Sequence, residues 1–110
     1  MKTVLLVTKE ESHRMLYERG LGKHFAVMYS ASPQDFAGAV DAVVYDLPKY
    51  PSGGSFRWLV DLDVPVVVLT ADERLRFPEI SKRSILVYPV RMNQVLEALA
   101  KLGVCAGGDC

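Results

Sequence analysis

The chain has 110 residues and a formal net charge of zero, with 13 Lys and Arg residues against 13 Asp and Glu residues. A balanced charge gives no overall field that would attract nucleic acid or an anionic membrane, so neither is expected as a partner. Half of the residues are hydrophobic, which excludes a disordered chain, and the length suffices for one domain with its own core. No apolar run approaches the roughly 20 residues of a membrane span, and the run at 3–7 is too short for a signal peptide, so we expect a cytoplasmic protein.

Five short apolar runs predict β-strands, and the segments between them predict helices of unequal quality. The first helix, at 12–20, carries Met15, Leu16 and Arg19 at helical spacing. A short second helix opens at Ser32, a third covers 55–62, and Pro78 leaves room only for a short or distorted fourth at 72–83. In chain order the strands are 3–7, 25–29, 42–45, 64–70 and 84–88, and a closing amphipathic helix carries Met92, Val95, Leu96, Leu99 and Leu102.

This alternation predicts a flavodoxin-like α/β fold: a doubly wound, five-stranded parallel sheet in three α/β/α layers. The domain is expected to span 1–103, followed by a flexible glycine- and cysteine-rich tail at 104–110. Cys105 and Cys110 both lie in that tail. Two thiols so close together are able to form a disulfide or half a metal site, but we interpret them as incidental.

In open α/β sheets the functional crevice lies at the carboxyl ends of the strands. The third strand ends in Asp46, and a loop rich in Pro and Gly follows it. Thr8 and Lys9 follow the first strand and Thr70 ends the fourth, so we expect these side chains near Asp46. His13, in the first helix, is predicted to lie at the surface.

These features resemble the receiver domain of bacterial response regulators over essentially the whole chain. The most specific match is the run 65–71, because the fourth strand of receivers commonly reads proline, apolar run, Thr or Ser, and Ala. Asp46 is similar to the phosphate-accepting aspartate of receivers, and Thr70 to their hydroxyl switch residue. Receivers usually end the fifth strand in Lys-Pro, where this chain has Tyr88 and Pro89. The resemblance implies a CheY-like fold, a cis bond before Pro89 and a switch-like role for Tyr88.

Two departures from the receiver pattern indicate a degenerate, pseudo-receiver type. Receivers usually end the first strand with an acidic pair that holds magnesium, and the matching positions here are Thr8 and Lys9. Tyr88 replaces the lysine that would contact the phosphoryl group. One carboxylate, a hydroxyl and a lysine make a poor magnesium site, because magnesium prefers several oxygen ligands. We therefore expect no cofactor, and a Lys9 ammonium paired with Asp46 in the place of metal and phosphate.

The interpretation that we favour is a receiver-like signal-transduction module that acts by protein–protein interaction, without phosphate acceptance and without enzyme activity. Its partner would be a histidine kinase, an output protein or a second copy, bound at 72–83, the fifth strand and the last helix. One alternative is a phosphorylatable receiver of a two-component phosphorelay, with Asp46 as acceptor and Glu10 or Glu11 among atypical magnesium ligands. The other is a small flavodoxin-like ligand-binding protein, supported by fold alone.

Overall fold

The computed structural model describes residues 2–31, 39–46, 63–71 and 83–104. These residues form five strands and two helices, and the predicted helices at 32–38, 55–62 and 72–82 lie outside them. None of the described helices is both long enough and apolar enough to cross a membrane. The elements in chain order are β1 (Thr3–Val7), α1 (Glu11–Gly22), β2 (Ala26–Ser30), β3 (Ala42–Asp46), β4 (Val66–Thr70), β5 (Arg83–Val87) and α3 (Met92–Lys101).

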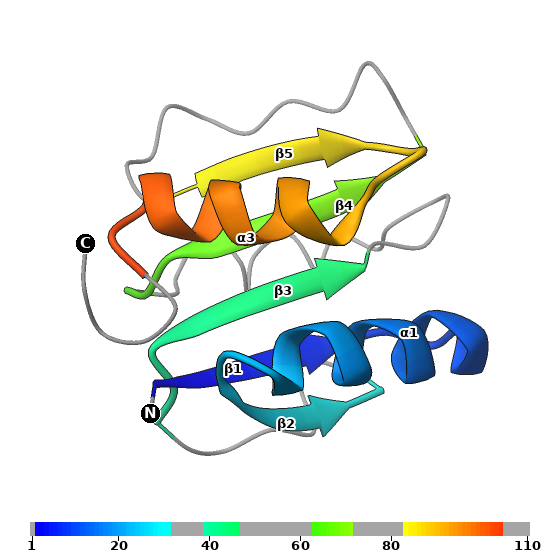
Figure 1. The fold of residues 1–110 in the computed structure, drawn as a ribbon, viewed down its shortest axis with the longest axis horizontal. Helices are drawn as coiled ribbons and strands as arrows, with labels where there is room; N and C mark the ends of the chain where they lie inside the picture. The colour runs from blue at the N-terminus through cyan, green and yellow to red at the C-terminus, as the bar shows by residue number, and fades with distance from the viewer. Residues whose placement is uncertain (1, 32–38, 47–62, 72–82, 105–110) are drawn as a thin grey trace.

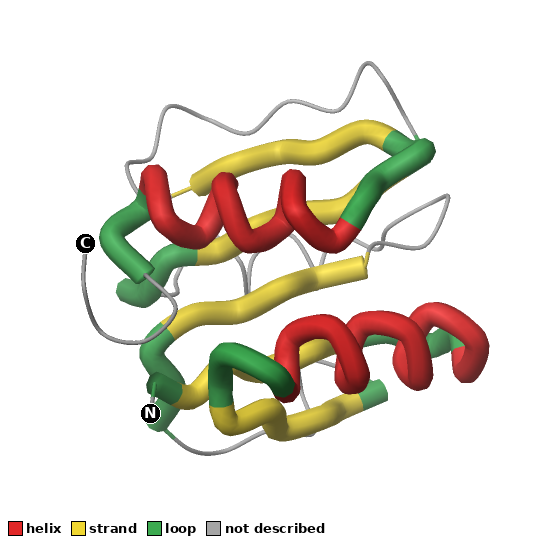
Figure 2. The backbone as a smooth tube through the Cα atoms, viewed as in Figure 1, coloured by secondary structure: helices red, strands yellow, loops and turns green. Residues whose placement is uncertain are grey.

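The strands form one parallel sheet in the order β2-β1-β3-β4-β5 (Figure 1). The chain moves from β1 outward to β2, returns across β1 to β3, and then continues outward to β5, which is the doubly wound order. α1 and α3 lie side by side over one face of this sheet, as the backbone trace also shows (Figure 2). The predicted flavodoxin-like fold is confirmed.

Two apolar cores flank the sheet, because side chains alternate between its faces along each strand. The core beneath the two helices combines Val4, Leu6 and Val44 with Tyr17 and Leu21 of α1 and with the inner residues of α3. The second core lies on the opposite face. β3 and β4 are buried at every position, as expected for inner strands of a parallel sheet. The second core contains Leu5, Val7, Val43, Tyr45, Val66 and Val68.

α1 and α3 approach each other closely at Gly20. A Cβ atom placed on Gly20 would lie 2.5 Å from the terminal methyl carbon of Met92, so a larger residue would require the Met92 side chain to move. After α3 the chain turns at Gly103, whose φ of 90° favours glycine. Val104 then returns to the first core and is buried. The tail was predicted to begin at 104, and residues 105–110 of it lie outside the described residues.

Candidate functional site

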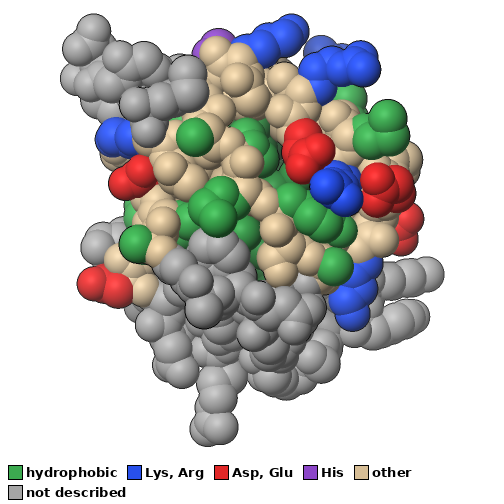
Figure 3. Space-filling view, turned by 90° about the horizontal axis from the view of Figure 1, so that it is seen from below, with side chains coloured by type: hydrophobic (Ala, Val, Ile, Leu, Met, Phe, Trp, Pro, Cys, Tyr) green, Lys and Arg blue, Asp and Glu red, His purple; other side chains and the backbone are tan. Residues whose placement is uncertain are grey.

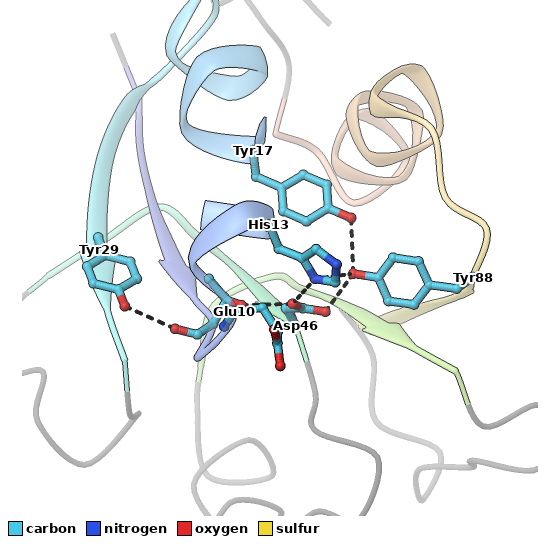
Figure 4. A network of polar contacts seen from close by, with 7 residues as sticks. Glu10, His13, Tyr17, Tyr29, Asp46 and Tyr88 are labelled. Carbon is cyan, nitrogen blue, oxygen red and sulfur yellow. Dashed lines mark hydrogen bonds and ion pairs between the residues drawn. The ribbon is translucent and has the colours of Figure 1, made fainter. Parts of the chain in front are cut away.

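The carboxyl edge of the sheet carries a cluster of polar side chains around Asp46 (Figure 4). Asp46 ends β3 and is only 7% exposed, and Thr8 follows β1 and is buried as well. α1 begins just after β1, which brings His13 to the same edge. Tyr88 arrives from the residue after β5. Three stretches far apart in the sequence, at 8–13, at Asp46 and at Tyr88, thus meet at one carboxylate.

Both carboxylate oxygens of Asp46 accept hydrogen bonds from the chain itself. The Thr8 hydroxyl donates to Oδ2 at 2.8 Å, and His13 Nδ1 lies 2.7 Å from the same oxygen. The Tyr88 hydroxyl donates to Oδ1 at 2.6 Å. A buried carboxylate is costly unless donors replace the water it has lost, and these three side chains supply them. Asp46 is therefore held by groups of β1, α1 and the end of β5 at once.

Local backbone geometry fixes two of these donors. The Thr8 hydroxyl accepts the backbone N–H of Glu10 at 3.1 Å, which leaves its own hydrogen for Asp46. His13 and Tyr17 are four residues apart on α1, so their side chains lie one above the other on the same side of the helix. Their rings meet edge to face, with centroids 6.0 Å apart. The helix thereby presents an imidazole and a phenol to the strand ends.

The proton positions in the cluster follow from its acceptors. An ionised carboxylate only accepts, so the imidazole hydrogen that points at Asp46 is on Nδ1 of His13. The pKa of Tyr88 is raised far above its ordinary value, mainly by burial and secondly by the hydrogen bond to Asp46. The Tyr88 hydroxyl therefore remains protonated. Its single hydrogen goes to Asp46, and the Tyr17 hydroxyl, 3.0 Å away, is then the donor to Tyr88. Burial also raises the pKa of Tyr17. Tyr17, Tyr88 and Asp46 form a directed chain of hydrogen bonds.

Arg14 fixes the opposite side of α1. Its guanidinium lies 3.8 Å from the centroid of the Tyr29 ring and 3.3 Å from the Glu18 carboxylate. The Tyr29 hydroxyl in turn donates to the backbone carbonyl of Thr8 at 3.2 Å. α1 is thus tied to β2 on one side and to Asp46 on the other, which sets the position of His13.

Two expectations for this site are wrong in detail. The Lys9 ammonium was expected beside Asp46, but Lys9 is exposed, and within the described part of the chain the nitrogen that lies against Asp46 belongs to His13. Thr8 turns inward, so its neighbour in the extended chain turns outward. His13 was expected at the surface, yet its side chain is 37% exposed and bonded to Asp46. No local pattern in the sequence marked His13, because its contact with Asp46 depends on where α1 and the end of β3 meet.

The other predicted positions lie at the same edge. Thr70 is buried at the end of β4, and its backbone carbonyl accepts the N–H of Tyr88 at 2.8 Å. The Tyr88–Pro89 peptide bond is cis, the geometry that the resemblance implied. The Tyr88 side chain points inward toward Asp46 (Figure 4).

These residues do not fit a magnesium ion. Magnesium needs a near-octahedral set of oxygen ligands, usually with one or two carboxylates. Around Asp46 stand a hydroxyl, an imidazole N–H and a phenol, each with its hydrogen directed at the carboxylate. The described residues contain no group of three or more His, Cys, Asp or Glu that could hold a metal. Glu10 and Glu11, the acids considered as substitutes, are both exposed.

Comparison with known proteins places the fold. No family model matches the chain, and no curated protein does. Among solved structures, a response regulator receiver protein from Sinorhizobium medicae has a TM-score of 0.74 at 22% identity, over 92% of this chain and 93% of its own. The Vibrio cholerae chemotaxis protein CheY4 has a TM-score of 0.73 at 19% identity, over 93% of this chain and 98% of its own. The Thermotoga maritima response regulator TrrA, solved with magnesium and beryllium fluoride, has a TM-score of 0.72 at 21% identity, over 93% and 99%. The chain thus has the fold of response regulator receiver domains.

Proposed function

We propose that this protein is a receiver-like signalling module that acts by contacting another protein and does not accept phosphate. The observation that carries the proposal is the occupation of both Asp46 oxygens by Thr8, His13 and Tyr88. The expected partners are a histidine kinase, an output protein or a second copy of the chain. The module carries out no reaction of its own.

Phosphoryl transfer depends on positioning the nucleophile and on neutralising charge on the transferring oxygens. The Asp46 oxygen that attacked phosphorus would first lose a hydrogen bond made by its own chain, either from Tyr88 or from Thr8 and His13. The incoming phosphoryl oxygens would then meet a neutral phenol, because the raised pKa of Tyr88 keeps it protonated. Both effects oppose phosphate acceptance at Asp46.

The same contacts favour a fixed structure over a switching one. Asp46 joins β3 to α1 through His13 and to the end of β5 through Tyr88. A carboxylate that is permanently hydrogen-bonded holds these elements in one arrangement, much as a bound phosphate and metal would hold them in a receiver that is phosphorylated. We therefore infer a module whose surface is constantly ready for its partner.

Incubation with acetyl phosphate and magnesium, followed by intact-mass analysis, tests the proposal. We expect no phosphate adduct on the natural chain. Tyr88→Phe frees Oδ1 of Asp46 without adding a cation, so it tests whether the Tyr88 hydrogen bond opposes phosphate acceptance. Asp46→Asn is the control, because it removes the carboxylate. An adduct on the natural chain that Asp46→Asn abolishes would overturn the proposal in favour of a working phosphate acceptor.

A further inference from the structure

The outward side of α1 is apolar at its centre. Met15 is 61% exposed and Leu16 is 60% exposed, and they are the two most exposed large hydrophobic side chains in the described part of the chain. The inward side is already filled by Tyr17 and Leu21, which are buried in the first core. Contiguous exposed apolar side chains with a polar surround are a common mark of a protein-binding surface.

Charged residues bound this apolar centre with opposite signs at its two ends. Glu11 lies in the first turn of α1 and Arg19 in its last turn. Met15 is four residues from each, so the three side chains lie along one stripe of the helix. Figure 3 views the molecule from below the orientation of Figure 1, the side on which α1 and β2 lie, and shows hydrophobic side chains with both acidic and basic side chains around them.

We propose that this stripe of Glu11, Met15, Leu16 and Arg19 is an interface for a second copy of the chain. A two-fold axis through Met15 places the two α1 helices antiparallel. Glu11 of each copy then faces Arg19 of the other, and Met15 and Leu16 meet their counterparts at the centre. The antiparallel order also sets the positive end of each helix dipole against the negative end of the other. The stripe is therefore complementary to itself in charge as well as in hydrophobicity.

The two charged residues are available for such contacts. The Glu11 side chain is 71% exposed, and its one ion pair within the described residues is a long contact of 3.8 Å with Arg14. Arg14 is itself held more closely by Glu18 at 3.3 Å and by the Tyr29 ring. Arg19 is exposed. Pairing between copies would thus break no strong contact within one copy.

The length of α1 sets the expected affinity of the proposed dimer. α1 has 12 residues, and a helix of about that length extends roughly 18 Å. One face of such a helix covers less than the roughly 800 Å² per partner of a standard stable interface. The dimer is therefore expected to be weak and to exchange at micromolar or higher concentrations. This inference rests on the proposed function only in that it names a second copy as the protein partner.

Sedimentation equilibrium of the natural chain over a wide concentration range is the first test. We expect reversible dimerisation and at least a tenfold rise in the dissociation constant for Leu16→Lys. Glu11→Arg and Arg19→Glu should each weaken the dimer, because each creates like charges at two symmetry-related places. The double variant Glu11→Arg with Arg19→Glu should restore it, although both changes oppose the helix dipole. Circular dichroism confirms that each variant remains folded.

Cross-linking tests the position of the axis independently. In a background with Cys105→Ser and Cys110→Ser, Met15→Cys should form a disulfide-linked dimer under mild oxidation, since a residue on a two-fold axis meets itself. Met28→Cys, at an exposed site on β2, is the matched control and should cross-link much less.

A monomer at all concentrations, or a dimer that Leu16→Lys leaves intact, would overturn the inference. Failure of the charge exchange to restore the dimer would overturn it as well. None of these readouts depends on phosphate. A monomeric chain that also gave no phosphate adduct would reject the second copy as partner while leaving the proposed function in place.

Discussion

α1 and α3 cover the same face of the sheet but bury different kinds of side chain. α3 turns Val95, Ala98 and Leu99 into the first core and leaves polar residues outside. α1 buries Tyr17 and Leu21, places a half-buried imidazole beside Asp46, and leaves its other apolar residues in solvent. The buried side chains of α3 thus lie in the apolar core, whereas the inner face of α1 also builds a polar cluster. Substitutions on the two helices should therefore differ in both size and kind.

The largest effect is expected on the inner face of α3. Leu99 is fully buried, and Leu99→Asp would leave an unpaired charge in the core and lower the free energy of unfolding by more than about 4 kcal/mol. If that variant does not fold, Leu99→Ala should still fold and cost about 2–5 kcal/mol. Urea denaturation measures both variants, with the exposed Glu97→Ala as control. Unchanged stability in the Leu99 variants would contradict the orientation of α3.

The second-largest loss of stability is expected in the polar cluster beside α1. Asp46→Ala removes the acceptor of Thr8, His13 and Tyr88, and leaves two hydroxyls and an imidazole without it. We expect a loss of about 3 kcal/mol in the free energy of unfolding. Asp41→Ala is the matched control, because Asp41 is an exposed aspartate that accepts one backbone N–H, from Thr3 at 2.7 Å. The control should cost about 1 kcal/mol or less, and equal losses would show that Asp46 has no special structural role.

Smaller losses of stability, of different size, are expected for the two tyrosines of the hydrogen-bond chain. Tyr88→Phe removes a donor to a carboxylate and should cost about 2 kcal/mol, whereas Tyr17→Phe removes a bond between neutral groups and should cost about 1 kcal/mol. The double variant should cost less than the sum of the two, because the Tyr17 bond ends on the hydroxyl that Tyr88→Phe deletes. Strict additivity in chemical denaturation would argue against a directed chain.

Stability should also fall in alkali. The pKa of Tyr88 and that of Tyr17 are raised in the folded protein, in both cases mainly by burial. Above a pH of about 10, unfolded tyrosines release protons that the folded chain retains, so the free energy of unfolding decreases as pH rises. Each tyrosine contributes at most about 1.4 kcal/mol per pH unit, and Tyr88, which is only partly buried, contributes less because solvent screens its interactions. Below that pH the contribution is fully present. Denaturation between neutral and alkaline pH should give a shallower slope for Tyr88→Phe, and an unchanged slope would contradict the raised pKa.

The contrast between the helices also explains what sequence reasoning was able to predict. The strands and α3 were predicted because a strand buried on both faces is a continuous apolar run and an amphipathic helix repeats apolar residues at spacings of three and four. The polar part of the inner face of α1 was not predicted, because His13 reads as a surface residue until Asp46 is known to lie beside it. Asp46 itself was predicted from its place at the end of β3. Which donors surround a carboxylate depends on where separate segments meet, and no local pattern contains that.

The smallest expected effect lies on the outer side of α1. Leu16 is 60% exposed, so Leu16→Ala removes little buried surface in the monomer and should change the free energy of unfolding by no more than about 0.5 kcal/mol. The same truncation at Leu99 costs several times more, although both residues are leucines on helices of one layer. Measuring both at a low protein concentration keeps the proposed dimer from contributing to stability. A large loss at Leu16 under these conditions would mean that the outer side of α1 is packed within one copy, and the comparison between the two helices would fail.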